Sequence, residues 1–250
     1  MKKKTVLGLI PTRLNSTRLP QKALLLINNI PLVVHTYKRA KLSKKLNDLY
    51  ICCDDKKIFS VVKKFGVKVL MTSKHQQNGT ERICEAYQKL GKKYDLVIDI
   101  QGDEPLISPY HIDDVINHHF KNPSFDIILP ILKAKNKNNT NIIKVVTDKK
   151  NKVLYLSRAN IPFEFKRSNT YMDKHLSIIS FKPNALIAFS KHKKTRLESI
   201  EDIELLRALE IGLTIKTIKL DGDSFSVDIF EDYAKANKKI SKDKFFKLYK

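Results

Sequence analysis

The segment 10–22 holds the residue types that bind phosphate groups. It reads IPTRLNSTRLPQK, so two arginines, a lysine, a serine and two threonines crowd into one stretch directly after an apolar run. Cations, hydroxyl groups and backbone amides gathered in this way suit a polyphosphate. The segment lacks the GxxxxGK[ST] pattern of a P-loop, and a solvated basic loop is the alternative interpretation.

A second segment, residues 98–106, reads IDIQGDEPL, an apolar strand pattern that ends in acids and a glycine. Gly102 is one of only seven glycines in the chain, so we expect a tight turn or a close backbone approach there. An exposed Asp103 at a strand end, beside a cationic phosphate loop, is a good ligand for Mg²⁺. An ordinary helix N-cap is the alternative for this aspartate.

Several other patterns could each contribute a single group. They are NGTER at 78–82, LSRA at 156–159, KHL at 174–176, the acids and arginine of 201–207, and SVDIFED at 226–232. Taken singly, each has a structural alternative: a capped helix start, a packed histidine or a helix N-cap. None of them alone indicates a function.

The chain is strongly basic. Its 250 residues include 48 Lys and Arg against 26 Asp and Glu, a formal net charge of +22. Only eight of the basic residues are Arg, and the Lys are spread along the whole sequence, which fits a compositional bias better than a phosphate-tracking stripe. A nucleic acid is therefore not the expected ligand, although small anionic substrates would be attracted. The scarce arginines are candidates for positions that need a planar, bidentate fork.

Signals for metal, redox or membrane chemistry are sparse. The adjacent Cys52 and Cys53 and the lone Cys84 form neither a disulfide framework nor a zinc spacing. A metal would therefore be a hard cation bound by carboxylates. No apolar run approaches the roughly 18–20 residues of a membrane span, and the basic start is too short for a secretory signal. We expect a cytoplasmic protein without a membrane span.

The element pattern indicates one α/β domain over residues 1–250. Four short apolar runs are typical of buried strands: residues 5–10, 49–53, 67–71 and 96–100. Helical spacing lies between them, and residues 81–90 are predicted to form a helix that ends at Gly91. This alternation predicts a mostly parallel sheet flanked by helices, whose ligands bind beyond the carboxyl ends of the strands. The two segments described first follow the first and fourth strands, so we expect them to share a site.

The second half of the chain has a less regular rhythm. We expect a polar loop and then further strands, at 133–141, 153–157, 176–181 and 214–220. These strands predict an embedded smaller lobe of mixed strands, roughly within 133–215. A helix is predicted over 199–210, with residues 199–202 as its capping box. A Lys-rich amphipathic helix at 235–250 is predicted to be a solvated surface element.

Taken together and in order, these motifs resemble those of the 3-deoxy-manno-octulosonate cytidylyltransferases, the CMP-Kdo synthetases, over nearly the whole chain. The opening IPTRLNSTRLPQKAL is similar to the family's IPAR-x-x-S-x-R-x-P-x-K-x-L, and MTSKHQQNGTERICEA and IDIQGDEPLI to its SGTER and N-x-QGDEP-x-I blocks. The segments YLSRANIPF, KHLSIISF, LESIEDIELLRALEIG and SVDIFEDY are similar to its YFSRA-x-IP, HLGIY, LE-x-IE-x-LEQLR and VDTPEDL segments.

The resemblance implies a Rossmann-like nucleotidyltransferase fold and a homodimer whose lobe binds sugar and mediates dimerisation. It implies Mg²⁺-dependent transfer of CMP from CTP to the anomeric hydroxyl of 3-deoxy-D-manno-octulosonate (Kdo), releasing pyrophosphate and forming CMP-Kdo for lipopolysaccharide or capsule synthesis. By the matching motifs, the expected catalytic residues are Lys22, Asp103 and Asp228, and the two aspartates would bind Mg²⁺. The expected CTP-binding residues are Arg13, Ser16, Arg18, Lys22 and Gln101. The expected sugar-binding residues are Arg82, Gln101, Arg158, His175 and Glu204.

Three positions depart from the family's motifs. Gln21 stands where the family commonly has glycine, Ile179 where it has the tyrosine of HLGIY, and Leu205 where it has the glutamine of EQLR. The last two changes remove two polar groups from the expected sugar-binding region, and sites that recognise hydroxyls discriminate through such groups. The alternative acceptors are therefore 8-amino-Kdo or a nonulosonic acid. Less favoured alternatives are a guanylyl- or uridylyltransferase, a nucleic-acid-binding protein and an inactive relative.

Overall fold

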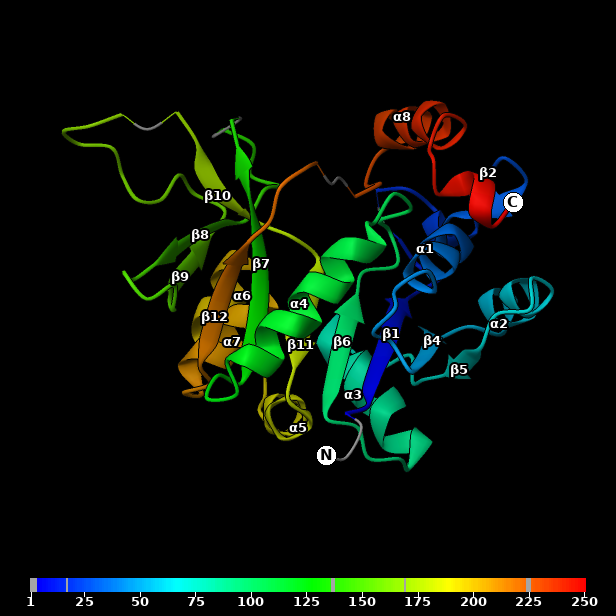
Figure 1. Cartoon of the computed structure of the whole chain (residues 1–250), viewed down its shortest axis with the longest axis horizontal. Coiled ribbons are helices and arrows are strands. Elements are labelled where there is room, and N and C mark those ends of the chain that lie inside the picture. The colour runs from blue at the N-terminus through cyan, green and yellow to red at the C-terminus, as the bar shows by residue number, and fades with distance from the viewer. Residues whose placement is uncertain (1–3, 17, 136–137, 169, 224–225) are drawn as a thin grey trace. The chain divides into compact units, whose positions relative to one another are not determined.

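The chain divides into two compact units (Figure 1). The structure, a computed structural model, describes residues 4–16, 18–135, 138–168, 170–223 and 226–250. Unit 1 consists of Met1–Asp114 together with Ser224–Lys250, and unit 2 is Val115–Asp223. The lobe expected within 133–215 falls inside the limits of unit 2, and its sugar-binding and dimerising roles stay predictions.

Unit 1 contains a parallel sheet with the strand order β5-β4-β1-β6. Its strands are β1 (Val6–Thr12), β4 (Asp48–Cys53), β5 (Val69–Met71) and β6 (Leu96–Ile100). β1 pairs in parallel with β4 on one side and with β6 on the other. β1 and β6 are buried almost throughout, as a parallel sheet covered on both faces requires. All four predicted strands are confirmed, with small shifts at their ends.

The helices of unit 1 cover both faces of this sheet. They are α1 (Leu32–Ala40), α2 (Lys56–Lys63) and α3 (Gly79–Leu90), which ends at Gly91 as predicted. The crossovers from β1 to β4 and from β4 to β5 run in one direction, and the crossover from β5 to β6 runs back. Because such crossovers are right-handed, α1 and α2 cover one face and α3 the other; α3 lies behind β1 and β6 in Figure 1. The strand order reverses between β1 and β6, so their carboxyl ends form the point at which such sheets bind ligands.

The C-terminal part of the chain belongs to the core of unit 1. After η1 (Lys22–Leu24) and the hairpin of β2 (Leu26–Ile27) and β3 (Ile30–Pro31), the chain adds α8 (Phe230–Ile240) and η2 (Phe246–Leu248). Ala236 and Ile240 of α8 are buried in one cluster with residues near β2. Arg39 of α1 pairs with Asp243 beyond the end of α8. The prediction of a solvated helix over 235–250 is therefore wrong, because α8 begins earlier, ends at Ile240 and buries one face.

Unit 2 contains a mixed sheet built around β7 (Ile127–Ala134). β7 pairs antiparallel with β11 (Ile178–Phe181) and β10 (Met172–His175), and parallel with β12 (Ile215–Lys219). The sheet continues from β10 through β8 (Lys144–Thr147) to β9 (Val153–Ser157). The helices are the end of α4 (Pro109–Lys121), α5 (Pro183–Lys191), α6 (Arg196–Glu201) and α7 (Glu204–Glu210). The predicted α/β architecture, with a parallel sheet and a smaller set of mixed strands, is confirmed.

The single helix predicted over 199–210 is wrong. The backbone at Asp202 is left-handed, with φ of 52°, and it separates α6 from α7. The capping interaction lies earlier than predicted, where Glu198 Oε2 accepts a hydrogen bond from the backbone N–H of Thr195 at 3.2 Å. Across the break, Arg207 donates to both carboxylate oxygens of Glu198 at 2.7 Å. This buried ion pair holds the two short helices together, which a sequence pattern does not reveal.

His119 makes unit 2 sensitive to acid. Its ring nitrogens lie 2.6 Å from Ser180 Oγ and 3.2 Å from the carbonyl of Phe125. Burial lowers its pKa to about 4, whereas an unfolded histidine titrates near 6.5. The neutral ring therefore contributes stability above about pH 6.5 that is lost as the pH falls toward 4. The free energy of unfolding of the parent protein should fall between pH 7 and pH 5. We expect this fall to be about 2 kcal/mol smaller in His119→Gln, because the variant has no imidazole to protonate. Urea titrations at both pH values measure it, and an unchanged difference contradicts the assignment.

Two further expectations concern the cysteines and the membrane. Cys52, Cys53 and Cys84 are free and buried, so no disulfide framework is present. Burial raises the pKa of Cys53 to about 11, which keeps this thiol protonated and unreactive at neutral pH. Throughout the described ranges, every helix is too short or too polar to cross a lipid bilayer.

Candidate active site

Lys22 lies between two carboxylates at the carboxyl end of the unit 1 sheet. Its Nζ donates to Asp103 Oδ2 at 2.7 Å and to Asp228 Oδ1 at 3.0 Å. Lys22 begins η1, Asp103 follows β6 and Asp228 precedes α8, so three segments far apart in sequence form one cluster. Their side chains are between 16% and 27% exposed, and so a ligand can reach them. The three residues expected to be catalytic are thus in direct contact, while their roles stay predictions.

Asp228 is held by several donors besides Lys22. Its Oδ1 also accepts from Arg18 Nη2 at 3.0 Å, and its Oδ2 accepts from Ser226 Oγ at 3.0 Å. The backbone N–H of Val227 donates to the carbonyl oxygen of Asp103 at 2.9 Å. This backbone bond ties the two acidic segments together, so the spacing of the carboxylates does not depend on Lys22 alone.

The loop that carries Asp103 is fixed by close contacts with β1 and α1. A Cβ atom at Gly102 would lie 2.8 Å from the carbonyl oxygen of Pro11, so only glycine fits there. The close backbone approach predicted at Gly102 is therefore confirmed. Thr36 Oγ1 donates to the Gly102 carbonyl at 3.2 Å, and Arg39 donates to the carbonyls that follow the loop. Arg39 was expected, as one of the eight arginines, to need its guanidinium fork, but Thr36 was not identified from the sequence, because nothing in a helix pattern marks a side chain that binds a distant backbone.

The charges of Lys22 and Asp228 stabilise each other. Burial acts to lower the pKa of Lys22, but Asp103 and Asp228 outweigh it and raise that pKa above its ordinary value. Burial also acts to raise the pKa of Asp228, but Lys22, helped by Ser226 and Arg18, lowers it below its ordinary value. Both groups are therefore ionised at neutral pH. The stability that ionised Asp228 contributes is present above about pH 4 and is lost as the pH falls through its lowered pKa.

Of the remaining residues expected to bind CTP, Arg18 contacts this cluster through Asp228, and Arg13, Ser16 and Gln101 lie in the segments that lead to Lys22 and Asp103. Arg13 and Arg18 are exposed and Ser16 is half-buried in the segment between β1 and η1; Thr17 lies outside the described residues. Gln101 Nε2 donates to Asp99 Oδ2 at 2.9 Å. A Cβ atom at Gly79 would lie 3.1 Å from that nitrogen, so Gln101 packs closely against the start of α3. Contacts of these residues with a nucleotide stay predictions.

Gln21, the residue that replaces the family's glycine, has a left-handed backbone with φ of 51°. This conformation costs a residue with a Cβ atom more than it costs glycine. The Gln21 side chain accepts from Lys57 Nζ at 2.6 Å, an exposed contact of little net value. We expect Gln21→Gly to raise the free energy of unfolding by about 1 kcal/mol. Chemical denaturation measures this free energy. Gln88→Gly, inside α3, is the control and should lower the free energy of unfolding by about 1 kcal/mol. Destabilisation by Gln21→Gly would contradict the prediction.

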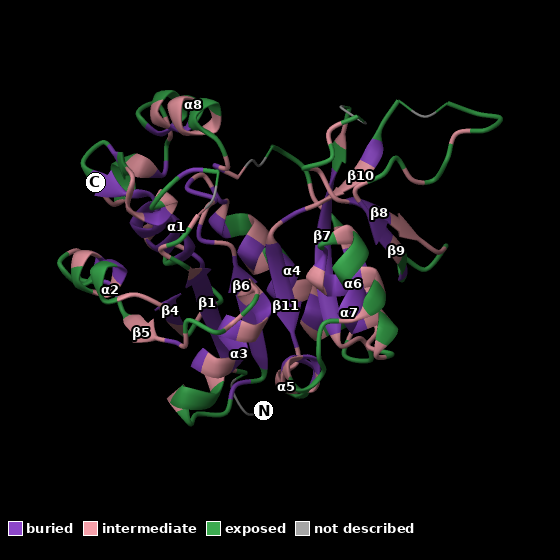
Figure 2. Ribbon diagram, turned by 180° about the vertical axis from the view of Figure 1, so that it is seen from behind, coloured by how far each residue is buried: buried purple, intermediate pink, exposed green. Residues whose placement is uncertain are grey.

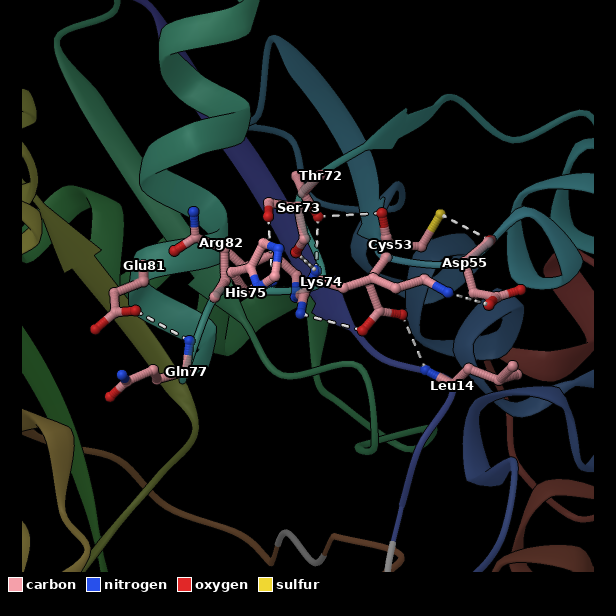
Figure 3. A network of polar contacts seen from close by, with 12 residues as sticks. Leu14, Cys53, Asp55, Thr72, Ser73, Lys74, His75, Gln77, Glu81 and Arg82 are labelled. Atoms are coloured by element: carbon pink, nitrogen blue, oxygen red, sulfur yellow. Dashed lines mark hydrogen bonds and ion pairs between the residues drawn. The ribbon is translucent and has the colours of Figure 1, made fainter.

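Arg82 is buried and its guanidinium contacts other parts of unit 1 (Figure 3). Nη1 donates to Thr72 Oγ1 at 2.7 Å and to the carbonyl of Ser73 at 3.1 Å, and Nη2 donates to Asp54 Oδ2 at 3.3 Å. Asp54 was not identified from the sequence. The expectation that Arg82 binds sugar stays a prediction, although its described partners are all protein groups.

Arg158, in unit 2, likewise binds backbone carbonyl groups. Its Nε donates to Glu201 at 2.8 Å, and its Nη atoms donate to Thr140 at 3.0 Å and Asp202 at 3.1 Å. Lys144 Nζ in turn donates to the carbonyl of Arg158 at 2.6 Å. In this arrangement Arg158 joins the end of β9 to the end of α6.

His175 and Glu204 are the other expected sugar-binding residues of unit 2. His175 ends β10, and burial, together with Lys174, lowers its pKa to about 4, so its ring is neutral at physiological pH. Within the described chain, its buried Nε2 has no hydrogen-bond partner. Glu204 is half-buried in the first turn of α7. Their contacts with a sugar stay predictions.

The two substitutions expected to alter the sugar-binding region point into the interior of unit 2. Ile179 and Leu205 are each 1% exposed. Ile179 belongs to β11 and Leu205 to α7, where both serve as core residues. Apolar side chains suit these two buried positions, because they leave no polar group without a hydrogen-bond partner.

The cluster around Lys22 offers the donors that a hard divalent cation prefers. Carboxylate oxygens of Asp103 and Asp228 both lie within 3.0 Å of one ammonium nitrogen, so they converge on a single positive charge. Mg²⁺ is usually bound through one or two carboxylates, with substrate phosphates and water as the other ligands. Among the described residues, His, Cys, Asp and Glu form no group of three or more able to hold a metal. The two carboxylates thus fit Mg²⁺ that is completed by substrate oxygens.

Several known proteins are similar to this chain in sequence and in structure. The family model for cytidylyltransferases matches residues 7–218. The 3-deoxy-manno-octulosonate cytidylyltransferase of Thermodesulfovibrio yellowstonii is 41% identical over 245 residues, covering 92% of this chain and 95% of the relative. The 8-amino-3,8-dideoxy-manno-octulosonate cytidylyltransferase of Shewanella baltica is 39% identical over 240 residues, covering 94% and 98%.

A solved structure agrees with these sequence matches. It is a CMP:2-keto-3-deoxy-manno-octonic acid synthetase in complex with CTP. The TM-score is 0.90 at 26% sequence identity, and the match covers 96% of this chain and 99% of the other.

Proposed function

Because the chain belongs to the cytidylyltransferase family, we propose that it transfers CMP from CTP to the anomeric hydroxyl of Kdo. The reaction would release pyrophosphate and form CMP-Kdo. The observation that carries this proposal is the contact of Lys22 with Asp103 and Asp228, to which the exposed Arg18 adds a second cation on Asp228. A triphosphate needs cations, and a metal that bridges its oxygens needs carboxylates.

The chemistry asks the protein for positioning and charge compensation rather than for a covalent intermediate. The anomeric oxygen attacks the α-phosphorus, a new P–O bond forms, and the bond to the bridging oxygen of the β-phosphate breaks. Pyrophosphate leaves with the electron pair, and the proton of the hydroxyl passes to water. Arg13, Ser16 and Arg18 would hold the phosphates, and the charged Lys22 would offset negative charge that develops on the phosphate oxygens.

We infer that Mg²⁺ is required and is held through Asp103 and Asp228. The converging carboxylate oxygens support this inference. Bound there, Mg²⁺ would lower the pKa of the attacking hydroxyl and offset the charge of the departing pyrophosphate. Before the metal and the substrates bind, Lys22 would hold the two carboxylates together and in place.

The second candidate acceptor is 8-amino-Kdo, because a relative with that substrate in its name is almost as similar as the one named for Kdo. The test is pyrophosphate release with CTP, Mg²⁺ and Kdo, 8-amino-Kdo or a nonulosonic acid in turn. We expect release with Kdo. Release with 8-amino-Kdo alone supports the second candidate. If the protein binds CTP but releases no pyrophosphate with any of the acids, the acceptor assignment is overturned. If pyrophosphate is released with GTP or UTP in place of CTP, the nucleotide assignment is overturned.

We also propose that the enzyme acts in the cytoplasm as a homodimer and supplies lipopolysaccharide or capsule synthesis. Phe163 and Phe165 of unit 2 are each 83% exposed, and large exposed apolar side chains often mark protein contacts. Light scattering on the purified protein measures the mass. A monomer at micromolar concentration would overturn the dimer.

A further inference from the structure

One guanidinium joins the ends of two strands in unit 1. Arg82 extends from α3 and is 3% exposed. Its Nη1 reaches Thr72 and Ser73, which follow β5 (Figure 3). Its Nη2 reaches Asp54, which follows β4. Arginine suits this place because its donors point in a fixed, planar fork.

Thr72 shows that this arrangement is specific. Its hydroxyl donates its single proton to the carbonyl of Cys53 at 3.1 Å. The oxygen is then available only as an acceptor, and Arg82 Nη1 is its donor at 2.7 Å. The backbone N–H of Thr72 also donates to Cys53 at 2.8 Å. The hydroxyl therefore fixes where the guanidinium lies.

Asp54 carries the contact onward to the segment after β1. Its Oδ2 faces Arg82, and its Oδ1 accepts from the backbone N–H of Leu14 at 3.1 Å. The Asp54 and Arg82 side chains are 11% and 4% exposed, so the pair is shielded from water and screened little by salt. Leu14 directly follows Arg13 and stands in the segment 13–18, which we call the phosphate loop.

We propose that Arg82 and Asp54 are positioning residues for the phosphate loop, acting on CTP through the Leu14 N–H rather than by contact with the sugar. The inference rests on the proposed function, because it assumes that this loop binds the triphosphate. A carboxylate that accepts from a backbone N–H holds that peptide in one orientation. Arg82 keeps Asp54 aimed at Leu14, and its Thr72 and Ser73 contacts keep Arg82 from turning away.

The test breaks this chain of contacts without removing volume. In Asp54→Asn, one side-chain atom becomes a donor, so the residue can satisfy Arg82 or Leu14 but not both. Arg82→Lys keeps the charge and loses the fork. We expect either variant to weaken CTP binding about tenfold, measured by calorimetry with Mg²⁺ and no acceptor. The double variant should be no weaker than the single ones, because both changes break the same connection.

Kinetics then separate positioning from sugar binding. In steady-state assays we expect KM for CTP to rise about tenfold in both variants, while KM for the acid acceptor changes less than twofold. Asp48→Asn is the matched control. Asp48 begins β4, the strand that Asp54 follows, and its carboxylate accepts from Lys68 and Tyr94, away from the phosphate loop. It should lower the thermal midpoint without changing CTP affinity.

Three results would overturn the inference. The first is a rise confined to KM for the acid acceptor, which would make Arg82 a sugar ligand. The second is a double variant whose loss of CTP affinity equals the sum of the two single losses. The third is an unchanged CTP affinity in the single variants. If Asp54→Asn does not fold, hydrogen exchange at the Leu14 amide in Arg82→Lys tests the inference instead. The amide must be protected from exchange in the parent protein and must lose that protection in Arg82→Lys. Calorimetry needs no acceptor, so a protein that binds CTP but transfers CMP to no acid would refute the proposed function and leave this inference testable.

Discussion

Replacing Asp103 by asparagine is expected to lower kcat by a factor of about 10²–10³ while the protein remains folded. Asp103 Oδ2 lies 2.7 Å from Lys22 Nζ, and the change removes one of the two charges that converge there. Asparagine keeps the size of the side chain, and the Asp103 backbone carbonyl still accepts from Val227, so the loop keeps its shape. The loss should appear in kcat and in the Mg²⁺ concentration needed for activity, measured by pyrophosphate release with saturating CTP.

Asp113→Asn is the matched control for this variant. Asp113 accepts from Ser43 and from the backbone of Lys44 and Lys45, at the other end of α1 from the cluster. It should alter stability and leave kcat within a factor of about two. An Asp103→Asn enzyme with parental kcat at the same Mg²⁺ concentration would refute the assignment of Asp103 to the metal.

Replacing Lys22 by methionine is expected to have two opposite effects. Turnover should fall by a factor of about 10², because the cation beside the phosphates is lost. Binding of a divalent cation to the nucleotide-free protein should instead become about tenfold tighter, because the ammonium no longer competes for Asp103 and Asp228. Mn²⁺ titrations followed by electron paramagnetic resonance measure the second effect.

The same titration on Asp103→Asn gives the converse result. Removing a carboxylate should weaken Mn²⁺ binding, so the two variants should depart from the parent protein in opposite directions. Weaker binding in both variants would mean that Lys22 supports the metal site rather than competing for it. Unchanged binding in both would place the metal elsewhere.

The four strands of the unit 1 sheet could be predicted from the sequence because each is a short apolar run between helical patterns. In unit 2, β9, β11 and β12 were predicted to within about two residues, whereas β7, β8 and β10 were not predicted. β6 and β9 begin and end at the predicted residues, and α3 ends at the predicted Gly91, whose φ is 60°. The alternation of elements also predicted that the segments after β1 and β6 share a site, whereas the strand order that makes this a switch point is known only from the structure. These features depend on local pattern and general topology, which a single sequence carries.

Predictions failed where distant side chains decide the local backbone. The pattern of 199–210 keeps helical spacing through Asp202, yet the Arg207–Glu198 pair is compatible with a break there. The end of the chain reads as a charged helix, yet Arg39 binds Asp243 and His35 lies 3.0 Å from the Tyr249 hydroxyl. Such pairings join residues up to 214 positions apart, and no window of sequence contains both partners.

The candidate site shows the same division. The family resemblance grouped Lys22, Asp103 and Asp228, and the fold brings their side chains into contact, while their roles stay predictions. The motif that contains Arg82 suggested a ligand, and only the fold brings Asp54 to it. An arginine in a motif cannot be distinguished from a buried one until its partners are known.

Unit 1 is assembled from both ends of the chain, with all of unit 2 between them. During synthesis, the ribosome must therefore complete unit 2 before it releases Asp228, and before Ala236 and Ile240 can fill the cluster that contains Leu19. A chain that stops early retains Lys22 and Asp103 but lacks the second carboxylate. Under the proposed function, a copy that stops before Asp228 is therefore expected to be inactive, although Lys22 and Asp103 are present.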